Sequence, residues 1–289
     1  MKSKFLILLA FAMLLYGSST GLAGPSVLGS AQDFAVLGAS TVTNTGPTTI
    51  YGNLGLYPLT SITGFPPGAV LPPAGIHQTD AVAKKAQSDA LDAYITLFNR
   101  PSTSDLTGQE LGGLTLKPGV YSFSTTAGLN GALTLDFASD PGGDFVFQIG
   151  TALTTGSGSS VDVRNGSPLS GVYWVMGIPG GSGTGSATLG TSTTFAGNII
   201  ALDSITLNTT ADILCGRAIA LNGAVTLDTN RISNNNTAED FGTRRSDFGS
   251  YGFSGGGSTI VIPAPSAFLL VAIGIASLSV FRKRTLILK

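Results

Sequence analysis

The stretch NIIALDSITLNTTADILCGRAIALNGAVTLDTN, residues 198–230, nearly repeats itself. Just ahead of it, Gly197 recurs as Gly216, and within it Thr206 recurs as Thr226. The interval is about 20 residues in both cases, and no helical pattern runs through it. Such a period is typical of a solenoid, in which each coil buries its apolar side chains only by stacking on the next coil. We therefore expect a stack of β-coils.

The composition of the 289-residue chain also favours a turn-rich β protein. The chain has 40 glycines, 43% hydrophobic residues and only 11% charged residues. This is too apolar for a disordered chain and too poor in helix formers for a helical one. The net charge of −1 provides no attraction for nucleic acid. The single cysteine, Cys215, excludes an internal disulfide and is expected to be a buried small hydrophobe.

The chain divides into four segments. Residues 1–23 combine two lysines, an apolar run and small residues, which predicts a secretory signal peptide and hence an exported protein. Residues 24–235 carry the β pattern and form the predicted domain. Residues 236–262 are rich in glycine and mixed charge without any period, which predicts a flexible linker.

The fourth segment, residues 263–289, joins prolines, an apolar run and a basic cluster at 282–284, which predicts a membrane helix whose basic end stays in the cytoplasm. This order resembles the bacterial PEP-CTERM sorting signal and implies a sorting protease as partner. Ala264 stands where that signal has Glu between two prolines. A plain membrane anchor is therefore the alternative, and the protein is expected outside the cell or on its envelope.

Residues 77–100 are the one segment with a strong helical pattern. Apolar side chains fall on one helical face and charged side chains on the other, and Pro101 follows, where a helix cannot continue. A lone amphipathic helix in a β chain needs a flat apolar surface, so we expect it along the side of the solenoid. Its predicted apolar face comprises Ala83, Ala86, Ala90, Leu91, Tyr94, Leu97 and Phe98.

Short stretches with a threonine between apolar residues recur along the domain. Most of the intervals are about 20 residues, and one is lengthened by the insertion GIPGGSGTGS at 177–186. Side chains alternate in a strand, so leucine, isoleucine or valine facing inward places threonine outward. We expect one row with a spacing of about 4.8 Å between coils. The predicted row is Thr115, Thr134, Thr154, Thr188, Thr206 and Thr226. More apolar stretches with Phe147, Trp174 and Ile199 are expected to form another wall of the coil.

Groups that support catalysis or metal binding are scarce in the sequence. The one histidine, His77, is expected to cap the helix or lie in a solvated loop, and no G-x-S-x-G nucleophile motif accompanies it. Asp140 and Asp144 lack the spacing of a known calcium loop. We predict no enzyme, no cofactor and no metal.

The threonine row itself is the candidate site. A stiff, nearly uncharged plane of methyl and hydroxyl groups suits a partner that is itself a lattice, such as ice or a crystalline polysaccharide. The alternative is that threonine merely favours solvent-facing strand positions.

Several stretches together carry a family resemblance: SAQDFAVLGASTVTNTG at 30–46, LGGLTLKPGVYSF at 111–123 and CGRAIALNGAVTLDTN at 215–230, with the helix between the first two. They resemble the microbial ice-binding protein family over nearly all of residues 27–230. The resemblance implies an all-β fold, a right-handed discontinuous β-helix of triangular section with one α-helix packed alongside. It also implies adsorption to ice through one flat face.

The stretches that match the family's ice-binding pattern are SITLN and GAVTLD. Their outward side chains are Ser204, Thr206, Asn208, Ala224, Thr226 and Asp228. Asp136 and Asp228 depart from an uncharged face, because a carboxylate keeps its hydration shell. The predicted function is an exported ice-binding protein that inhibits ice recrystallisation. The alternatives are an adhesion or matrix protein that binds extracellular polysaccharide and, last, a polysaccharide-degrading β-helix enzyme.

Overall fold

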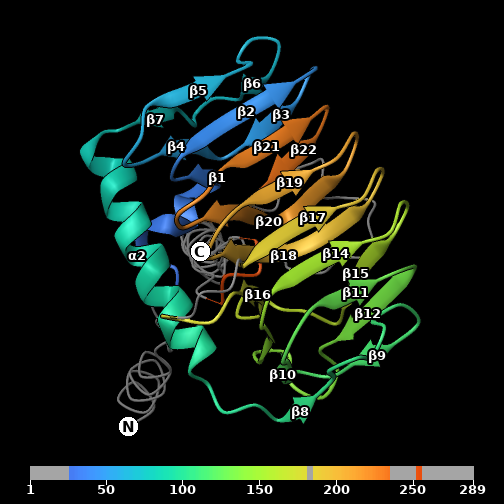
Figure 1. Ribbon diagram of the computed structural model, residues 1–289. Helices are drawn as coiled ribbons and strands as arrows, with labels where there is room; N and C mark the ends of the chain where they lie inside the picture. Colours follow the sequence, from blue (N-terminus) through green and yellow to red (C-terminus); the bar gives the residue numbers. More distant parts are fainter. Residues whose placement is uncertain (1–25, 181–184, 235–251, 256–289) are drawn as a thin grey trace, which may run out of the picture. The chain divides into compact units, whose positions relative to one another are not determined.

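The computed structural model describes residues 26–180, 185–234 and 252–255. The predicted signal peptide, the predicted C-terminal membrane helix and most of the predicted linker lie outside these residues. Within them the strands wind as coils with three walls, which we call faces a, b and c (Figure 1). Every pairing between named strands is parallel, as a solenoid requires.

Each strand lies on one of the three faces, except β18 and β20, which run from face c into face a. Face a comprises β1 (Phe34–Gly38), β4 (Asn53–Leu56), β7 (Ile76–Gln78), β8 (Ser104–Asp105), β10 (Gly119–Phe123), β13 (Asp144–Ile149), β16 (Gly171–Met176) and the C-terminal parts of β18 (Thr194–Ala201) and β20 (Asp212–Ala220). Face b comprises β2 (Thr41–Thr45), β5 (Ser61–Thr63), β11 (Ala127–Leu129), β14 (Ala152–Thr155), β17 (Ser186–Leu189), β19 (Ile205–Leu207) and β21 (Val225–Asp228). Face c comprises β3 (Thr49–Tyr51), β6 (Ala69–Val70), β9 (Thr115–Leu116), β12 (Ala132–Asp136), β15 (Ser160–Arg164), β22 (Arg231–Ser233) and the N-terminal parts of β18 and β20.

The β-helix is discontinuous along the chain. Strands β1 to β7 build the coils at one end, and helix α2 (Ala81–Phe98) then carries the chain along the side to the other end (Figure 1). From β8 onward the coils stack back until β20 pairs with β1 and β21 pairs with β2. The expected β-helix with one helix alongside is confirmed.

Helix α2 covers face a, as predicted for the side of the solenoid. Its buried residues pack against apolar side chains of β1, β13, β16, β18 and β20. The Gln87 side chain donates to the carbonyls of Gly38 (2.9 Å) and Ala220 (3.1 Å), and the Tyr94 hydroxyl donates to the Gly177 carbonyl (2.6 Å). The prediction was wrong for Leu91, which is 44% exposed, because it lies at the edge of the stripe that contacts the sheet.

The helix begins later than the predicted residue 77. Asp80 is the N-cap, and its carboxylate accepts a hydrogen bond from the Ala83 N–H at 2.8 Å. The imidazole Nδ1 of His77 lies 2.8 Å from the same carboxylate. His77 lies in β7 and contacts the cap residue, so it has a structural role near the cap, although it is neither the cap itself nor in a loop.

The interior of the coil is filled by aliphatic and aromatic side chains. The rings of Phe147 and Trp174 stack with their centroids 3.8 Å apart, and the Trp174 indole N–H donates to the Ala196 carbonyl at 3.1 Å. Ile199 and Cys215 are fully buried in the same core. The residues expected as core are thus confirmed as core.

Four residues of the predicted linker are docked on the fold. Phe253 is fully buried, its carbonyl accepts the Val172 N–H at 2.9 Å, and Ser254 forms an antiparallel bridge with Gly171. The expectation of a flexible linker is therefore wrong for residues 252–255, because the Phe253 side chain completes the core there. The rest of 236–262 lies outside the described residues.

Candidate functional site

Face b carries a row of threonines in register. Its strands lie one above another from β5 to β11 (Figure 1). At the centre of the strands, six threonines from successive coils are paired with one another in the order Thr154, Thr188, Thr206, Thr226, Thr43 and Thr63. With a spacing of about 4.8 Å between coils, the row is about 24 Å long.

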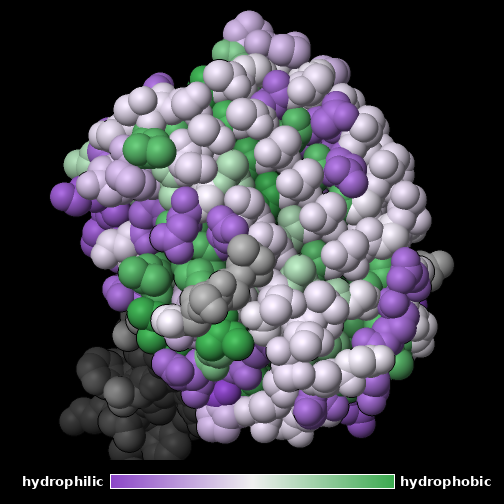
Figure 2. All heavy atoms as spheres, viewed as in Figure 1, coloured by the Kyte–Doolittle hydropathy of each residue, from purple (hydrophilic) through white to green (hydrophobic). Residues whose placement is uncertain are grey.

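One further column of outward side chains lies on each side of this row. Two residues earlier on each strand lies a column of small residues, and two residues later lies a mixed column that is polar in its three middle coils. The first column comprises Ala152, Ser186, Ser204, Ala224, Thr41 and Ser61, and the second includes Asn208, Asp228 and Thr45. The surface seen from this side is mostly pale, which marks residues of near-neutral hydropathy (Figure 2). Face b is therefore broad and weakly polar.

The row is held from behind by the core. Most residues between the outward ones are buried, and Leu153, Ile205 and Val225 have no exposed surface. The strand backbones are joined to the neighbouring coils by the sheet, so neither the backbone nor the β-branched threonine side chains have much freedom. Across the join between the C-terminal and N-terminal coils, the hydroxyls of Thr43 and Thr226 lie 3.4 Å apart. The row therefore continues without a gap from the C-terminal coil of Thr226 to the N-terminal coil of Thr43, although these coils are far apart in the sequence.

Two residues of the predicted row lie elsewhere. Thr115 and Thr134 pair with each other on face c, and the next coil places Asp162 beside Thr134. The prediction was wrong because the coil from Thr134 to Asp162 is lengthened by an extra loop at 138–143. A step of about 20 residues from Thr134 therefore reaches face b of the following coil. The regular spacing between these threonines was a coincidence.

Two other members of the row, Thr43 and Thr63, were not predicted. Both lie in the N-terminal coils, which precede the helix and so do not continue the regular interval that leads to Thr226. The local signal was present in the alternation of Thr41, Val42 and Thr43, since only Val42 is fully buried.

Faces b and c differ in charge. Outward positions of face c include Asp136 opposite Arg164 in register, and Asp212, whose carboxylate lies 3.2 Å from the Arg231 guanidinium. Asp136 therefore does not place a carboxylate on the face of the threonine row, because it lies on face c.

Asp228 does lie on face b, at its margin. Its carboxylate oxygens accept hydrogen bonds from the hydroxyls of Thr209 (2.5 Å) and Thr229 (3.0 Å). These partners hold the carboxylate at the corner between faces b and c, beside the row.

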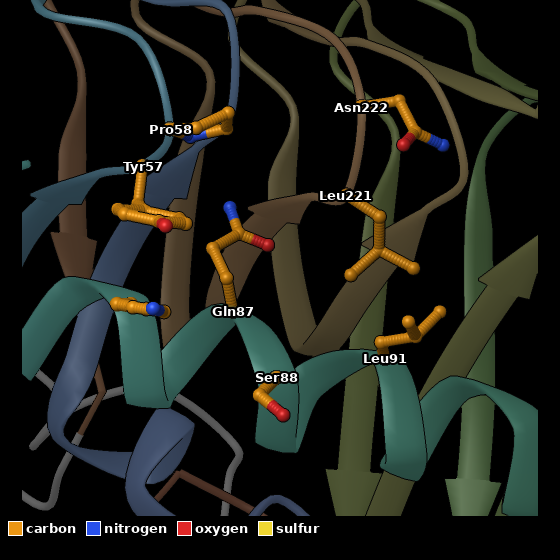
Figure 3. Close-up of a pocket in the computed structure, with 8 residues that line it drawn as sticks. Tyr57, Pro58, Gln87, Ser88, Leu91, Leu221 and Asn222 are labelled. Carbon is orange, nitrogen blue, oxygen red and sulfur yellow. The ribbon is translucent and has the colours of Figure 1, made fainter.

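A shallow groove lies between α2 and the coil loops. Tyr57 and Leu221 of the loops lie beside Gln87 and Leu91 of the helix (Figure 3). Within residues 26–180, 185–234 and 252–255, no three His, Cys, Asp or Glu side chains gather into a possible metal site. The same residues include no helix with the length and apolar composition of a membrane span.

Comparison with known proteins agrees with this architecture. A family model described as ice-binding-like matches residues 36–233. An ice-binding protein of Nostoc sp. (strain HG1) is 51% identical over 232 residues, which is 80% of this chain and 82% of that protein.

Two solved structures have the same fold. The crystal structure of an ice-binding protein from an Antarctic biological consortium has a TM-score of 0.65 and 41% identity, and the match covers 75% of this chain and 95% of that one. The crystal structure of an ice-binding protein from the Antarctic ascomycete Antarctomyces psychrotrophicus has a TM-score of 0.67 and 38% identity, and covers 74% and 100%. From the fold, the family match and these relatives together, the chain belongs to the ice-binding-like family.

Proposed function

We propose that this protein adsorbs to ice and that face b is the surface it uses. The observation that carries the proposal is the row of six threonines in register, from Thr154 to Thr63, on a flat parallel sheet. Relatives that are named ice-binding proteins support the function. The comparisons give no support to the alternative partner, an extracellular polysaccharide.

The physical reason is the match between a rigid array and a lattice. Outward side chains recur about 4.8 Å apart between coils and about 6.7 Å apart along a strand. Each threonine offers a methyl group that gains from leaving liquid water, at roughly 25 cal/mol per Å², and a hydroxyl that bonds to water in the crystal. Many weak contacts form at once because the array is already ordered before it meets ice.

The test replaces two central threonines by a side chain that breaks the plane. We expect Thr206→Tyr with Thr226→Tyr to reduce inhibition of ice recrystallisation by more than tenfold, because the bulky rings hold the neighbouring threonines away from the crystal. Recrystallisation is measured as the growth of ice grains at a fixed protein concentration.

Face c provides a matched control. Thr115→Tyr with Thr134→Tyr makes the same chemical change at the same pairing geometry on the other face. The control is expected to keep wild-type activity. Equal activity of both double variants, with both folded, would refute the assignment of face b.

Export, and anchoring or sorting through residues 263–289, remain part of the proposal. They are supported by the sequence patterns of the two ends, which lie outside the described residues. An enzyme activity is not proposed, since the similar proteins are ice-binding proteins by name.

A further inference from the structure

The threonine row of face b stops before the β-helix ends. In the coil next to Thr154 the central position is Gly128, and in the coil beyond it Glu110 forms a parallel bridge with Gly128. Face b thus continues for two more coils in which hydroxyl groups are replaced by a glycine and a carboxylate.

The Glu110 side chain is fixed across this surface. One carboxylate oxygen accepts the Asn130 backbone N–H at 2.7 Å, and the other accepts the Asn130 side-chain N–H at 2.9 Å. A Cβ atom at Gly128 would lie only 2.9 Å from the second oxygen. The carboxylate therefore lies directly over Gly128, and the absence of a side chain at Gly128 gives it room to do so.

The carboxylate is held in its charged form. Partial burial of Glu110 opposes ionisation, but hydrogen bonds from the Asn130 side chain and from backbone N–H groups outweigh it and lower the pKa below its ordinary value. An ionised carboxylate binds its hydration water strongly and in its own geometry. Such water does not fit an ice lattice, and Glu110 is exposed to solvent at this point.

We propose that Glu110 sets the limit of the ice-contacting surface. Its carboxylate, spread over Gly128, ends adsorption at Thr154, so that ice meets the coils from Thr154 to Thr63 and not the two coils beyond. The proposal rests on face b being the ice-binding face. It gives Glu110 the role of a residue that determines the extent of contact.

The direct test extends the row. In the full chain, Glu110→Thr with Gly128→Thr removes the carboxylate and adds two threonines in register with Thr154. We expect thermal hysteresis at equal molar concentration to rise by about one third, in proportion to the added row length. Asp162→Asn removes one negative charge from face c and is expected to leave thermal hysteresis unchanged.

A second variant separates charge from structure. Glu110→Gln keeps the size of the side chain and one oxygen that accepts an Asn130 N–H, so it is expected to fold with a slightly lower Tm while thermal hysteresis rises. The wild type should show the same rise only as the pH falls well below 4.5, the ordinary pKa of Glu, because the pKa of Glu110 is lowered, and Glu110→Gln should not respond to that change.

The inference is overturned if folded Glu110→Gln and the double threonine variant have wild-type or lower activity. This outcome differs from failure of the proposed function. If the proposed function failed, Thr206→Tyr with Thr226→Tyr would also leave activity unchanged. If only the role of Glu110 failed, that double variant would still reduce activity more than tenfold.

Discussion

Gly216 shows at the scale of one residue why the sequence nearly repeats. It pairs in register with Gly197 in the adjacent coil. A Cβ atom on Gly216 would lie 1.9 Å from the Gly197 carbonyl oxygen. A backbone oxygen cannot move aside as the end of a flexible side chain can, so the repeated glycine is required by the contact between coils.

We expect Gly216→Ala to lower the free energy of unfolding by about 3 kcal/mol, at the upper end of the range for overpacked cores, because only backbone shifts can relieve the clash. Chemical denaturation monitored by circular dichroism measures the change. The control is Gly75→Ala, since no atom lies within 4 Å of a Cβ at Gly75. Equal midpoints for the two variants would contradict the explanation.

Helix α2 illustrates the scale of the element. Asp80 caps its N-terminus. The hydrogen bond that the Asp80 carboxylate accepts from the Ala83 N–H lowers the pKa of Asp80 below 3.8, its ordinary value. Because the folded-state pKa is the lower one, this contribution to stability is complete above the unfolded-state pKa and is lost as the pH falls through the folded-state pKa.

Asp80→Ala is therefore expected to lower the free energy of unfolding by about 1 kcal/mol at neutral pH. The difference from wild type should disappear as the pH falls well below 3.8, the ordinary value for Asp. Tm measured across the pH range tests this. Asp92→Ala, an exposed position within the helix, should show neither effect. A difference that persists unchanged at low pH would show that the cap charge is not the cause.

Elements also show what the sequence could predict. The alternation around Thr206 and Thr226 is strict, so the inward and outward positions of these strands follow from the pattern alone. The wall on which a strand lies does not, since it depends on the length of each corner loop. The loop at 138–143 lengthens one coil, so a step of about 20 residues leads from Thr134 on face c to Thr154 on face b. The pairing of β21 with β2 joins the two ends of the domain sequence, and no local pattern carries that information.

At the scale of the molecule, both ends of the described domain meet at one corner. The Ser26 hydroxyl donates to the Ser254 carbonyl at 3.0 Å. The buried Arg217 donates to the carbonyls of Gln32 (3.0 Å from Nε) and Gly252 (3.2 Å from Nη1). Face c precedes face a along the chain, so this corner, at the first residues of β13 and β16, lies between these two faces. In a three-walled coil it lies opposite face b.

Phe253→Ala tests whether the docked segment belongs to the fold. Loss of the buried ring is expected to cost about 2 kcal/mol, and mainly to release residues 252–255 locally. The Val172 amide, which donates to the Phe253 carbonyl, should then exchange its hydrogen much faster, while amides in the middle of β16 keep their protection.

Leu169→Ala changes an exposed side chain near the same segment and should leave the Val172 amide protected. Unchanged exchange at Val172 in Phe253→Ala would show that the segment is not held by its aromatic ring.

The central claim is that one face of this β-helix meets ice. The most direct measurement is partition into a slowly growing ice crystal, as the fraction of protein that the crystal takes up. The wild type and the face c variant, Thr115→Tyr with Thr134→Tyr, are expected to be taken up equally. The face b variant, Thr206→Tyr with Thr226→Tyr, is expected to stay in the liquid, and its uptake at the wild-type level while folded would contradict the account.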